Sequence, residues 1–345
     1  MYKIILISVL IALCLSWMSG CGLGLNNGAG DEPFFEDTGF AMGTVVFQTI
    51  YSEDKEISQE ILELLTALEQ EKLSWRAEGS EIAEINRSSK EGKPTKVSVE
   101  MMGYLSHALS VAKNSGGAFD PAIGLLTKLW DFDGAKNSVP PSEEIEALLE
   151  GADYRNIRLD CVFVWVDKGA SIDLGAVGKG IGCDEAEKYL DEKANVESAL
   201  INLGGSSILT YGTKDSGEPW TIAVLNPRAD GHLGYIEITG TKHISTSGDY
   251  NRYFIEDGRR YHHILDPHTG YPADAGLMSV TVVSDKGADS DALSTAALVL
   301  GKDKALELLE KYGAEAIFVD TDKNVYMTEQ LERKFTLTAD GYKLA

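Results

Sequence analysis

Residues 198–225, SALINLGGSSILTYGTKDSGEPWTIAVL, decide the fold class, because they hold strand-like runs with no helical pattern between them. Ser198–Leu203 and Thr221–Leu225 have the apolar and β-branched composition that is typical of strands. Further strand-like runs are Thr44–Tyr51, Val162–Val166, Arg260–Leu265, Leu277–Val283 and Ala316–Val319. A doubly wound parallel sheet needs regular alternation of strands and helices, which this order lacks. We therefore predict an α+β fold with mixed, largely antiparallel sheets and packed helices.

Apolar residues at helical spacing predict helices outside the strand-rich centre. The expected helices are Ile57–Leu68, Met101–Leu109, Gly178–Leu190, Asp291–Leu300 and, after Gly301, Lys302–Tyr312. The adjacent Met101 and Met102 are interpreted as core residues. No internal repeat and no second linker divides the chain, so one folded unit is expected over residues 39–345.

The first residues have the pattern of a bacterial export signal. Lys3 precedes an apolar run, Ile4–Met18, which at about fifteen residues is short for a membrane span of roughly twenty. Small residues then precede Cys21, as at the cleavage site of a lipoprotein signal. We expect residues 1–20 to be removed and Cys21 to carry a lipid that anchors the exported protein to the outer side of the cell membrane. An ordinary cleaved signal peptide and an uncleaved membrane helix are the alternatives.

Residues 21–38 are rich in glycine, asparagine and acid, which predicts a flexible tether between the lipid and a domain that starts at Gly39. The domain retains Cys161 and Cys183, which form neither a disulfide framework nor a zinc-binding spacing. Cys161 lies in an apolar, strand-like run and is expected to be a small core residue.

The composition excludes partners that bind through basic surfaces. The chain has 31 basic and 54 acidic residues and a net charge of −23, which repels nucleic-acid phosphates and anionic lipid headgroups. The acidic residues are spread along the chain, as in a solvated globular surface.

Residues 172–180, IDLGAVGKG, are the first segment whose residues could form a functional site. A short strand ends in Asp173, a glycine-rich turn follows, and a helix begins beside Lys179. Such a turn presents backbone groups and a cation to a phosphorylated ligand, although its spacing matches neither a Walker A motif nor GxGxxG. A purely structural turn is the alternative.

Residues 288–296, ADSDALSTA, are the second segment. Asp291 and Thr295 are four residues apart, so they share one helix face and offer a carboxylate and a hydroxyl together. Mg²⁺ prefers such hard oxygen ligands and completes its shell with phosphate oxygens and water. The alternative is that Asp289 and Asp291 are an N-cap and a first-turn acid.

Residues 262–272, HHILDPHTGYP, hold three of the six histidines, and histidine is the side chain best suited to proton transfer near neutral pH. No Glu or Cys completes a zinc ligand set within this segment, and an ordinary structural histidine is the other alternative. Three more segments, Gly116–Pro121, Asn202–Gly205 and Thr246–Tyr250, are compatible with ordinary turn chemistry.

Taken in order, these motifs resemble the ApbE family of FAD:protein FMN transferases over residues 40 to about 330. The ordered set is Phe40–Thr44, then Trp75, Ser80 and Asn86, then Gly117–Asp120, Asp173–Gly180, Asn202–Gly205, Thr246–Tyr250, His263–Gly270 and Asp291–Ala296. Many members are lipoproteins, which agrees with the signal at Cys21.

The resemblance implies that residues 39–345 form a catalytic domain that moves FMN from FAD, its substrate, to a Thr or Ser hydroxyl of an acceptor flavoprotein and releases AMP. It implies an FAD site formed by Met42, Trp75, Ala118, Phe119, Asp120, Asp173, Lys179 and Ile264. It implies that Mg²⁺ is held by the Ala176 carbonyl, Asp291, Ser294 and Thr295. His263 and Lys179 would be catalytic, with His263 close to the reacting phosphate.

The chain departs from the family pattern at two places. Trp75 stands where the family often has Tyr, and Ile181 and Gly182 stand where it often has Tyr and Ala. Neither change touches the expected metal ligands. The alternatives to transfer are an FAD pyrophosphatase that uses water as acceptor, a solute-binding lipoprotein of a transporter, and a protein that stores flavin without turnover.

Overall fold

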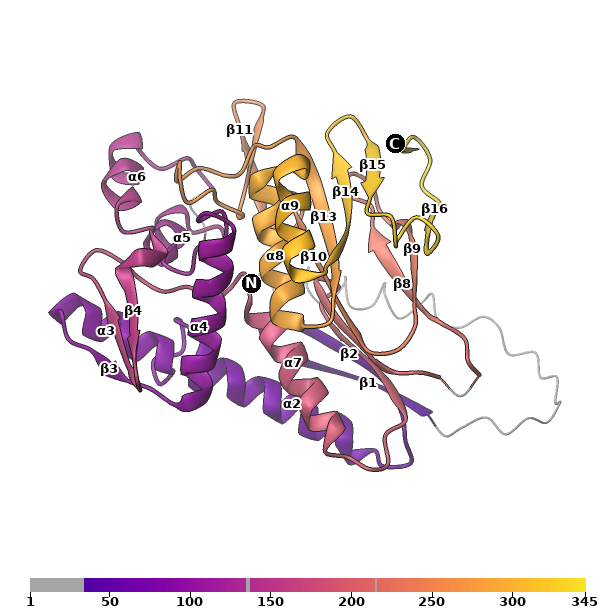
Figure 1. The fold of residues 1–345 in the computed structure, drawn as a ribbon. Coiled ribbons are helices and arrows are strands. Elements are labelled where there is room, and N and C mark those ends of the chain that lie inside the picture. Colours follow the sequence, from indigo (N-terminus) through magenta and orange to yellow (C-terminus); the bar gives the residue numbers. More distant parts are fainter. Residues whose placement is uncertain (1–33, 135–136, 215) are drawn as a thin grey trace, which may run out of the picture. The chain divides into compact units, whose positions relative to one another are not determined.

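A large antiparallel sheet organises the protein in the computed structural model, which describes residues 34–134, 137–214 and 216–345 (Figure 1). In spatial order its strands are β1 (Phe34–Ala41), β2 (Thr44–Tyr51), β6 (Ser198–Leu203), β7 (Ser207–Gly212), β10 (Lys242–Gly248), β13 (Leu277–Ser284), β14 (Glu315–Asp320), β15 (Asn324–Met327) and β17 (Lys343–Leu344). Neighbouring strands are antiparallel except β15 and β17, which are parallel. The predicted α+β class with a largely antiparallel sheet is confirmed.

Helices cover one face of this sheet. They are α2 (Glu56–Ala67), which continues as a π-helix over Leu68–Leu73, α7 (Gly178–Asp191), α8 (Gly287–Leu300) and α9 (Lys302–Tyr312). Alternate residues of β2, such as Val46 and Ile50, are fully buried against the apolar stripe of α2, which includes Ile57 and Ile61. The predicted helices at these places are confirmed.

A second, smaller sheet covers part of the opposite face. Its order is β16 (Phe335–Leu337), β9 (His232–Ile238) and β8 (Trp220–Leu225). Ile222 and Ile236 of this sheet share a buried cluster with Ile244 of β10. Because side chains alternate along β10, Ile244 faces the small sheet, while the neighbouring odd-numbered residues face α8.

A third group of elements packs beside α8 (Figure 1). It comprises α3 (Glu81–Glu91), α4 (Val99–Asn114), α5 (Gly124–Trp130), α6 (Ser142–Leu149), a 3-10 turn at Tyr154–Asn156, and a sheet of β3 (Thr95–Lys96), β5 (Phe163–Val166) and β4 (Ile157–Asp160). The ribbon β11 (Tyr253–Glu256) and β12 (Arg259–His262) lies apart from the large sheet. Met101 on α4 is fully buried in one cluster with Leu293 of α8, so its predicted core role is confirmed.

Two expectations are corrected by the structure. The predicted tether extends to residue 38, but β1 begins at Phe34, because the first strand pairs along its whole length with β2. Cys161 is exposed and not a core residue, since it occupies the turn between β4 and β5 with a positive φ of 52°. Local apolar composition could not show that the chain reverses at this cysteine.

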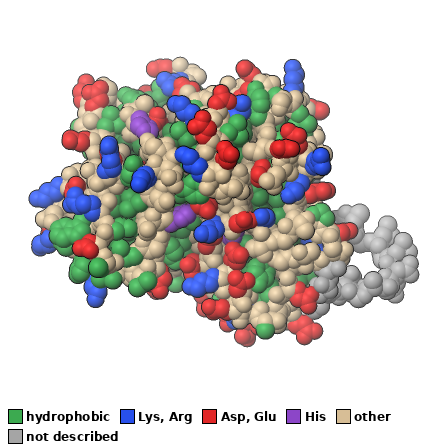
Figure 2. Space-filling view, viewed as in Figure 1, with side chains coloured by type: hydrophobic (Ala, Val, Ile, Leu, Met, Phe, Trp, Pro, Cys, Tyr) green, Lys and Arg blue, Asp and Glu red, His purple; other side chains and the backbone are tan. Residues whose placement is uncertain are grey.

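The predicted signal peptide, residues 1–20, and Cys21 lie outside the described residues. No helix in the described ranges combines the length and the apolar character required to span a bilayer. On the face shown in Figure 2, basic side chains are interspersed among acidic ones and do not form a separate basic surface.

Candidate functional site

The first turns of α7 and α8 meet at two glycines, and this contact builds the site. A Cβ on Gly180 would lie 2.1 Å from the Gly287 carbonyl oxygen, and a Cβ on Gly287 would lie 2.2 Å from the Gly180 carbonyl oxygen. Only residues without a side chain permit this approach. It brings Asp291 to α7, where the carboxylate Oδ2 accepts a hydrogen bond of 2.9 Å from the Gly180 N–H.

The Ala176 carbonyl lies just before α7. Because α7 begins at Gly178, the Gly180 N–H is one of the first N–H groups of the helix, which have no acceptor within it. Here it donates to Asp291, and among the described residues no backbone N–H donates to the Ala176 oxygen. The Asp291 carboxylate is 6% exposed and has a second oxygen to offer. The geometry fits the prediction that Ala176 and Asp291 are ligands of one cation.

Thr295 and Ser294 lie one turn further along α8. Ser294 is fully buried, and its hydroxyl donates to the Asp291 carbonyl at 2.9 Å. Ser247 of β10 places its Oγ 2.8 Å from Ser294 Oγ and 3.1 Å from Thr295 Oγ1. Thr295 is partly exposed. Carboxylate, hydroxyl and carbonyl oxygens are the donor set that Mg²⁺ takes, so the residues present fit the predicted metal.

The start of α8 differs from the prediction, and this changes the interpretation of Asp291. The helix begins at Gly287 and not at Asp291, because Asp184 of α7 accepts hydrogen bonds from the Gly287 N–H at 2.5 Å and the Ala288 N–H at 2.9 Å. The first-turn acid is therefore Asp289. Asp291 lies in the second turn, so neither alternative role at the helix start, N-cap or first-turn acid, applies to it.

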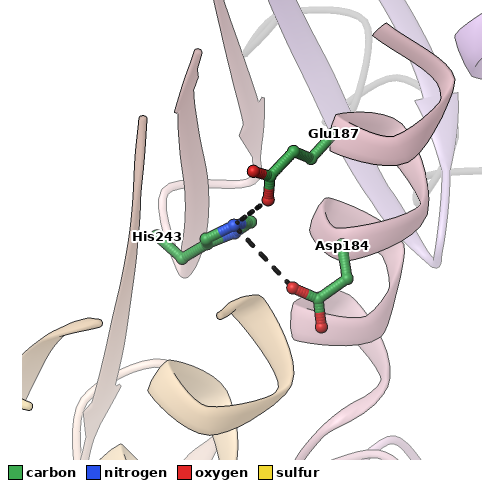
Figure 3. A group of neighbouring side chains, drawn as sticks. All are labelled: Asp184, Glu187 and His243. Atoms are coloured by element: carbon green, nitrogen blue, oxygen red, sulfur yellow. Dashed lines mark hydrogen bonds and ion pairs between the residues drawn. The ribbon is translucent and has the colours of Figure 1, made fainter. Parts of the chain in front are cut away.

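Asp184 belongs to a group that sequence reasoning missed (Figure 3). His243 of β10 is fully buried, with its Nε2 2.7 Å from Glu187 Oε2 and 3.7 Å from Asp184 Oδ1. One ligand atom from each residue lies within 4.8 Å of the others, a spacing that could hold a metal. However, both Asp184 oxygens cap α8 and Glu187 pairs with His243. A structural role explains these contacts, because they hold α7, β10 and α8 together.

Lys179 and His263 bring contrasting charge states to the site. Lys179 is partly buried, and its ammonium forms no hydrogen bond or ion pair with another described residue. The pKa of His263 is held well below its usual range, first by burial and then by the positive charges of Arg252, His262 and Lys179. The imidazole is therefore neutral at neutral pH, and its enclosed Nδ1 has no hydrogen-bond partner among the described residues.

Trp75 combines an aromatic surface with two cations. The Arg76 guanidinium lies 4.0 Å from the centroid of the Trp75 ring, and the Lys128 Nζ lies 4.6 Å from it. The pKa of Lys128 is lowered, first by burial and then by the charge of Lys90. The buried Nε1 of Trp75 has no partner among the described residues. A ligand with an aromatic ring, phosphates and a hydrogen-bond acceptor would satisfy these groups.

The Ala118–Asp120 turn is held against the segment that leads to Asp173, which forms an isolated bridge at Ser171 and not the predicted strand. Asp120 accepts hydrogen bonds of 2.8 Å from the Ala122 and Tyr154 N–H groups. Burial nevertheless raises its pKa to about 6. The following carbonyl, of Pro121, accepts a hydrogen bond of 2.9 Å from the Asp173 N–H. Two motifs separated by about fifty residues in sequence are thus side by side.

Met42 and Ile264 complete the predicted FAD residues. Met42 has a φ of 55° in the turn between β1 and β2, and its Cε lies 3.9 Å from the position of a Cβ on Gly178. A Cβ on Gly182 would lie 3.0 Å from Leu65 Cδ2, so this departure from the family pattern makes room for a leucine of α2. Ile264 is 7% exposed and shares a core cluster with Phe119.

Asn86 and Ser80 hold backbone segments of the site in place through hydrogen bonds. Asn86 is buried in α3 and clamps the backbone of Ile172: its Nδ2 donates to the Ile172 carbonyl at 2.8 Å, and its Oδ1 accepts from the Ile172 N–H at 2.7 Å. Ser80 caps α3 through the Ala83 N–H and donates to the Ser74 carbonyl at 2.6 Å, which closes the loop that contains Trp75. Both residues belong to the ordered motif set of the family resemblance, and the structure shows which backbone groups they hold.

Fold and site define an antiparallel α+β protein in which two helix starts bring hard oxygens, a lysine and a neutral histidine together. The chain matches the ApbE family over residues 42–318 and belongs to that family.

Curated relatives and solved structures agree with this assignment. The FAD:protein FMN transferase of Treponema pallidum (strain Nichols) is 31% identical over 339 residues, covering 90% of this chain and 93% of the relative. That of Klebsiella pneumoniae (strain 342) is 33% identical over 321 residues, covering 91% and 98%. The crystal structure of the ApbE protein of Thermotoga maritima is similar with a TM-score of 0.81 and 35% identity, covering 88% of this chain and 99% of that one. The apo flavinyl transferase ApbE of Pseudomonas stutzeri has a TM-score of 0.77 and 28% identity, covering 89% and 98%.

Proposed function

We propose that this enzyme transfers FMN from FAD to a Thr or Ser hydroxyl of an acceptor flavoprotein and releases AMP. The observation that carries the proposal is the junction of α7 and α8. There a free Ala176 carbonyl and the Asp291 carboxylate stand beside Lys179, next to the neutral His263. The relatives from Treponema pallidum and Klebsiella pneumoniae, both named FAD:protein FMN transferase, support it.

The transfer is a substitution at phosphorus. The acceptor oxygen attacks the phosphorus of the FMN half, and a new P–O ester bond forms as the bond to the bridging pyrophosphate oxygen breaks. The electron pair of the broken bond leaves with AMP. Lys179 offsets the negative charge that grows on the bridging oxygen, and it stays available because no carboxylate of the described residues pairs with it.

His263 is the residue that we assign as general base. The acceptor hydroxyl must lose its proton as the new bond forms, and an uncharged imidazole can take it without first losing one. Because Nδ1 is enclosed by protein, Nε2 is the ring atom left to receive the proton. Burial and the nearby cations keep this base ready over the neutral pH range.

The metal-binding residues complete the proposal. Mg²⁺ bound by the Ala176 carbonyl, Asp291, Ser294 and Thr295 would neutralise pyrophosphate charge. Asp291 provides the only formal negative charge in this set, and it is oriented by the Gly180 N–H.

The proposed cellular location is the outer side of the membrane, with a lipid on Cys21. The apolar run and the small residues before Cys21 support it. In this arrangement the acceptor flavoprotein would be exported or would expose its flavin-carrying segment on the same side.

The testing experiment mixes the soluble domain with FAD, Mg²⁺ and a candidate acceptor protein, and measures FMN on the acceptor by mass spectrometry and AMP in solution. One AMP should be released for each FMN attached to a Thr or Ser. The matched variant is Asp291→Asn, which keeps an oxygen to accept the Gly180 N–H but removes the charge, and it should attach no FMN. FMN and AMP released in equal amounts with every acceptor unlabelled would instead identify an FAD pyrophosphatase.

A further inference from the structure

Two serine pairs join β10 to α8, and only one of them reaches the metal-binding residues. Ser245 and Ser247 lie two residues apart on the face of β10 that packs on α8. Ser245 Oγ lies 2.8 Å from Ser290 Oγ, and Ser247 Oγ lies 2.8 Å from Ser294 Oγ. All four serines are buried, with at most 8% exposure. Ser247 alone also contacts Thr295, at 3.1 Å.

The protons in this group can be assigned by counting. Each hydroxyl has one proton to donate. Ser294 donates its proton to the Asp291 carbonyl, which can only accept, so its contact with Ser247 must use the proton of Ser247. Ser247 then has no proton left for Thr295. The contact between them therefore runs from the Thr295 hydroxyl to Ser247 Oγ.

This order makes a directed chain from Thr295 to Ser247, to Ser294 and to the Asp291 carbonyl. As a result, the Thr295 hydroxyl hydrogen points toward Ser247 Oγ. The lone pairs of Thr295 Oγ1 are then not engaged by a donor among the described residues. A helical threonine otherwise divides between two rotamers, because its hydroxyl can also bond to a carbonyl three or four residues earlier. Ser247 removes that rotamer freedom by accepting the hydrogen bond from the Thr295 hydroxyl.

We infer that Ser247 is a positioning residue, which orients the Thr295 hydroxyl as a lone-pair ligand for the divalent cation of the proposed reaction. The inference rests on the proposed function, since it concerns the same metal. It gives Ser294 a second task, because its donation to the Asp291 carbonyl fixes the direction of the whole chain. It also gives a role to the Thr246–Tyr250 segment, which the sequence analysis placed among the family motifs without assigning it a function.

The test is a titration of the full chain, with FAD bound, by Mn²⁺ followed by electron paramagnetic resonance and by Mg²⁺ followed by calorimetry. Ser247→Ala should weaken metal binding about 10- to 100-fold, the usual effect of removing a group that orients a ligand. FMN transfer should recover at high Mg²⁺ concentration. Ser247→Cys, which keeps a similar shape but accepts hydrogen bonds weakly, should behave in the same way.

Ser245→Ala is the matched control. It removes the same kind of buried hydroxyl from the same face of the same strand, and it loosens the same helix, but it has no contact with Thr295. It should reduce thermal stability about as much as Ser247→Ala and leave the metal affinity unchanged.

Two outcomes would overturn the inference: metal affinity lost equally in Ser245→Ala and Ser247→Ala, or metal affinity retained in Ser247→Ala. The wild type and Asp291→Asn separate these results from a failure of the proposed function. If the wild type binds no metal, the metal part of the proposed function fails and this inference fails with it. If the wild type binds metal, Asp291→Asn does not, and Ser247→Ala matches the wild type, only the role of Ser247 is wrong.

Discussion

A single added methyl group at Gly180 should damage activity far more than stability. The Cβ of Gly180→Ala would lie 2.1 Å from the Gly287 oxygen and 2.7 Å from Asp291 Cβ. Because nonbonded carbon atoms settle at about 3.5–4.0 Å, α8 must move away from α7 by on the order of 1 Å. That shift stretches the 2.9 Å hydrogen bond from the Gly180 N–H to Asp291.

The two effects have different sizes. Overpacking costs about 1–3 kcal/mol of unfolding free energy, and alanine returns up to about 1 kcal/mol through its helix propensity. The net loss of stability is thus about 0–3 kcal/mol. Displacing a catalytic group by about 1 Å costs roughly 100-fold in rate, so kcat/KM for FMN transfer should fall by about that factor.

The assay compares FMN transfer with thermal unfolding in three glycine variants. Gly103→Ala on α4 has no atom within 4 Å of its added Cβ, so it should keep full activity and gain up to about 1 kcal/mol. Gly182→Ala, on the same helix as Gly180, meets only the flexible ends of side chains, with Leu65 the nearest at 3.0 Å, and should lose little. A Gly180→Ala enzyme within a few-fold of the wild-type kcat/KM would show that the glycine contact does not place Asp291.

Asp291→Ala and Asp291→Asn should both reduce the rate of FMN transfer at least about 100-fold. Only Asp291→Ala should also lose about 1–3 kcal/mol of unfolding free energy, because it leaves the buried Gly180 N–H without an acceptor. Equal unfolding free energies for the two variants would contradict this. Burial raises the pKa of Asp120 from 3.8 to about 6. The folded protein therefore holds this proton more tightly than the unfolded chain, and the stabilisation is complete below pH 3.8 and lost as the pH rises through about 6. The unfolding free energy of the wild type relative to Asp120→Asn should accordingly fall by about 2 kcal/mol between pH 4 and pH 7, as measured by denaturant titration, and a pH-independent difference would refute it. Fluorescence titration should show tighter binding of FAD than of riboflavin, since Lys179, Lys128 and Arg76 have phosphates to contact only in FAD; equal affinities would remove the argument for a phosphate site. Cys21→Ser should release the protein from the membrane fraction, whereas unchanged membrane association without cleavage would point to an uncleaved anchor.

The sequence by itself determined the elements whose pattern is local. The alternation in Thr44–Tyr51 and Ser198–Leu203 gave strands with those bounds, and the apolar stripe of Lys302–Tyr312 gave a helix with those bounds. The order of strands without helical crossovers was enough for the antiparallel class, and the ordered motifs were enough for the family. These features depend on backbone propensity and side-chain periodicity, which adjacent residues encode. The helices α3, α5 and α6 were missed. α5 and α6 are only seven and eight residues long, which is short for a periodic pattern, whereas α3 has an N-cap at Ser80 and buries Ile82 and Ile85 on one face, a signal that was available.

Only the tertiary structure decided how the site is assembled. The start of α8 depends on Asp184, which lies about a hundred residues earlier in the chain and caps the helix from α7. The Gly180 N–H, which α7 leaves without an acceptor, finds one on Asp291 of another helix. The Thr295 hydroxyl is oriented by a serine of β10. The two capping bonds supply acceptors that the first turn of a helix cannot provide from its own chain, and all three contacts depend on how closely two helices and a strand pack.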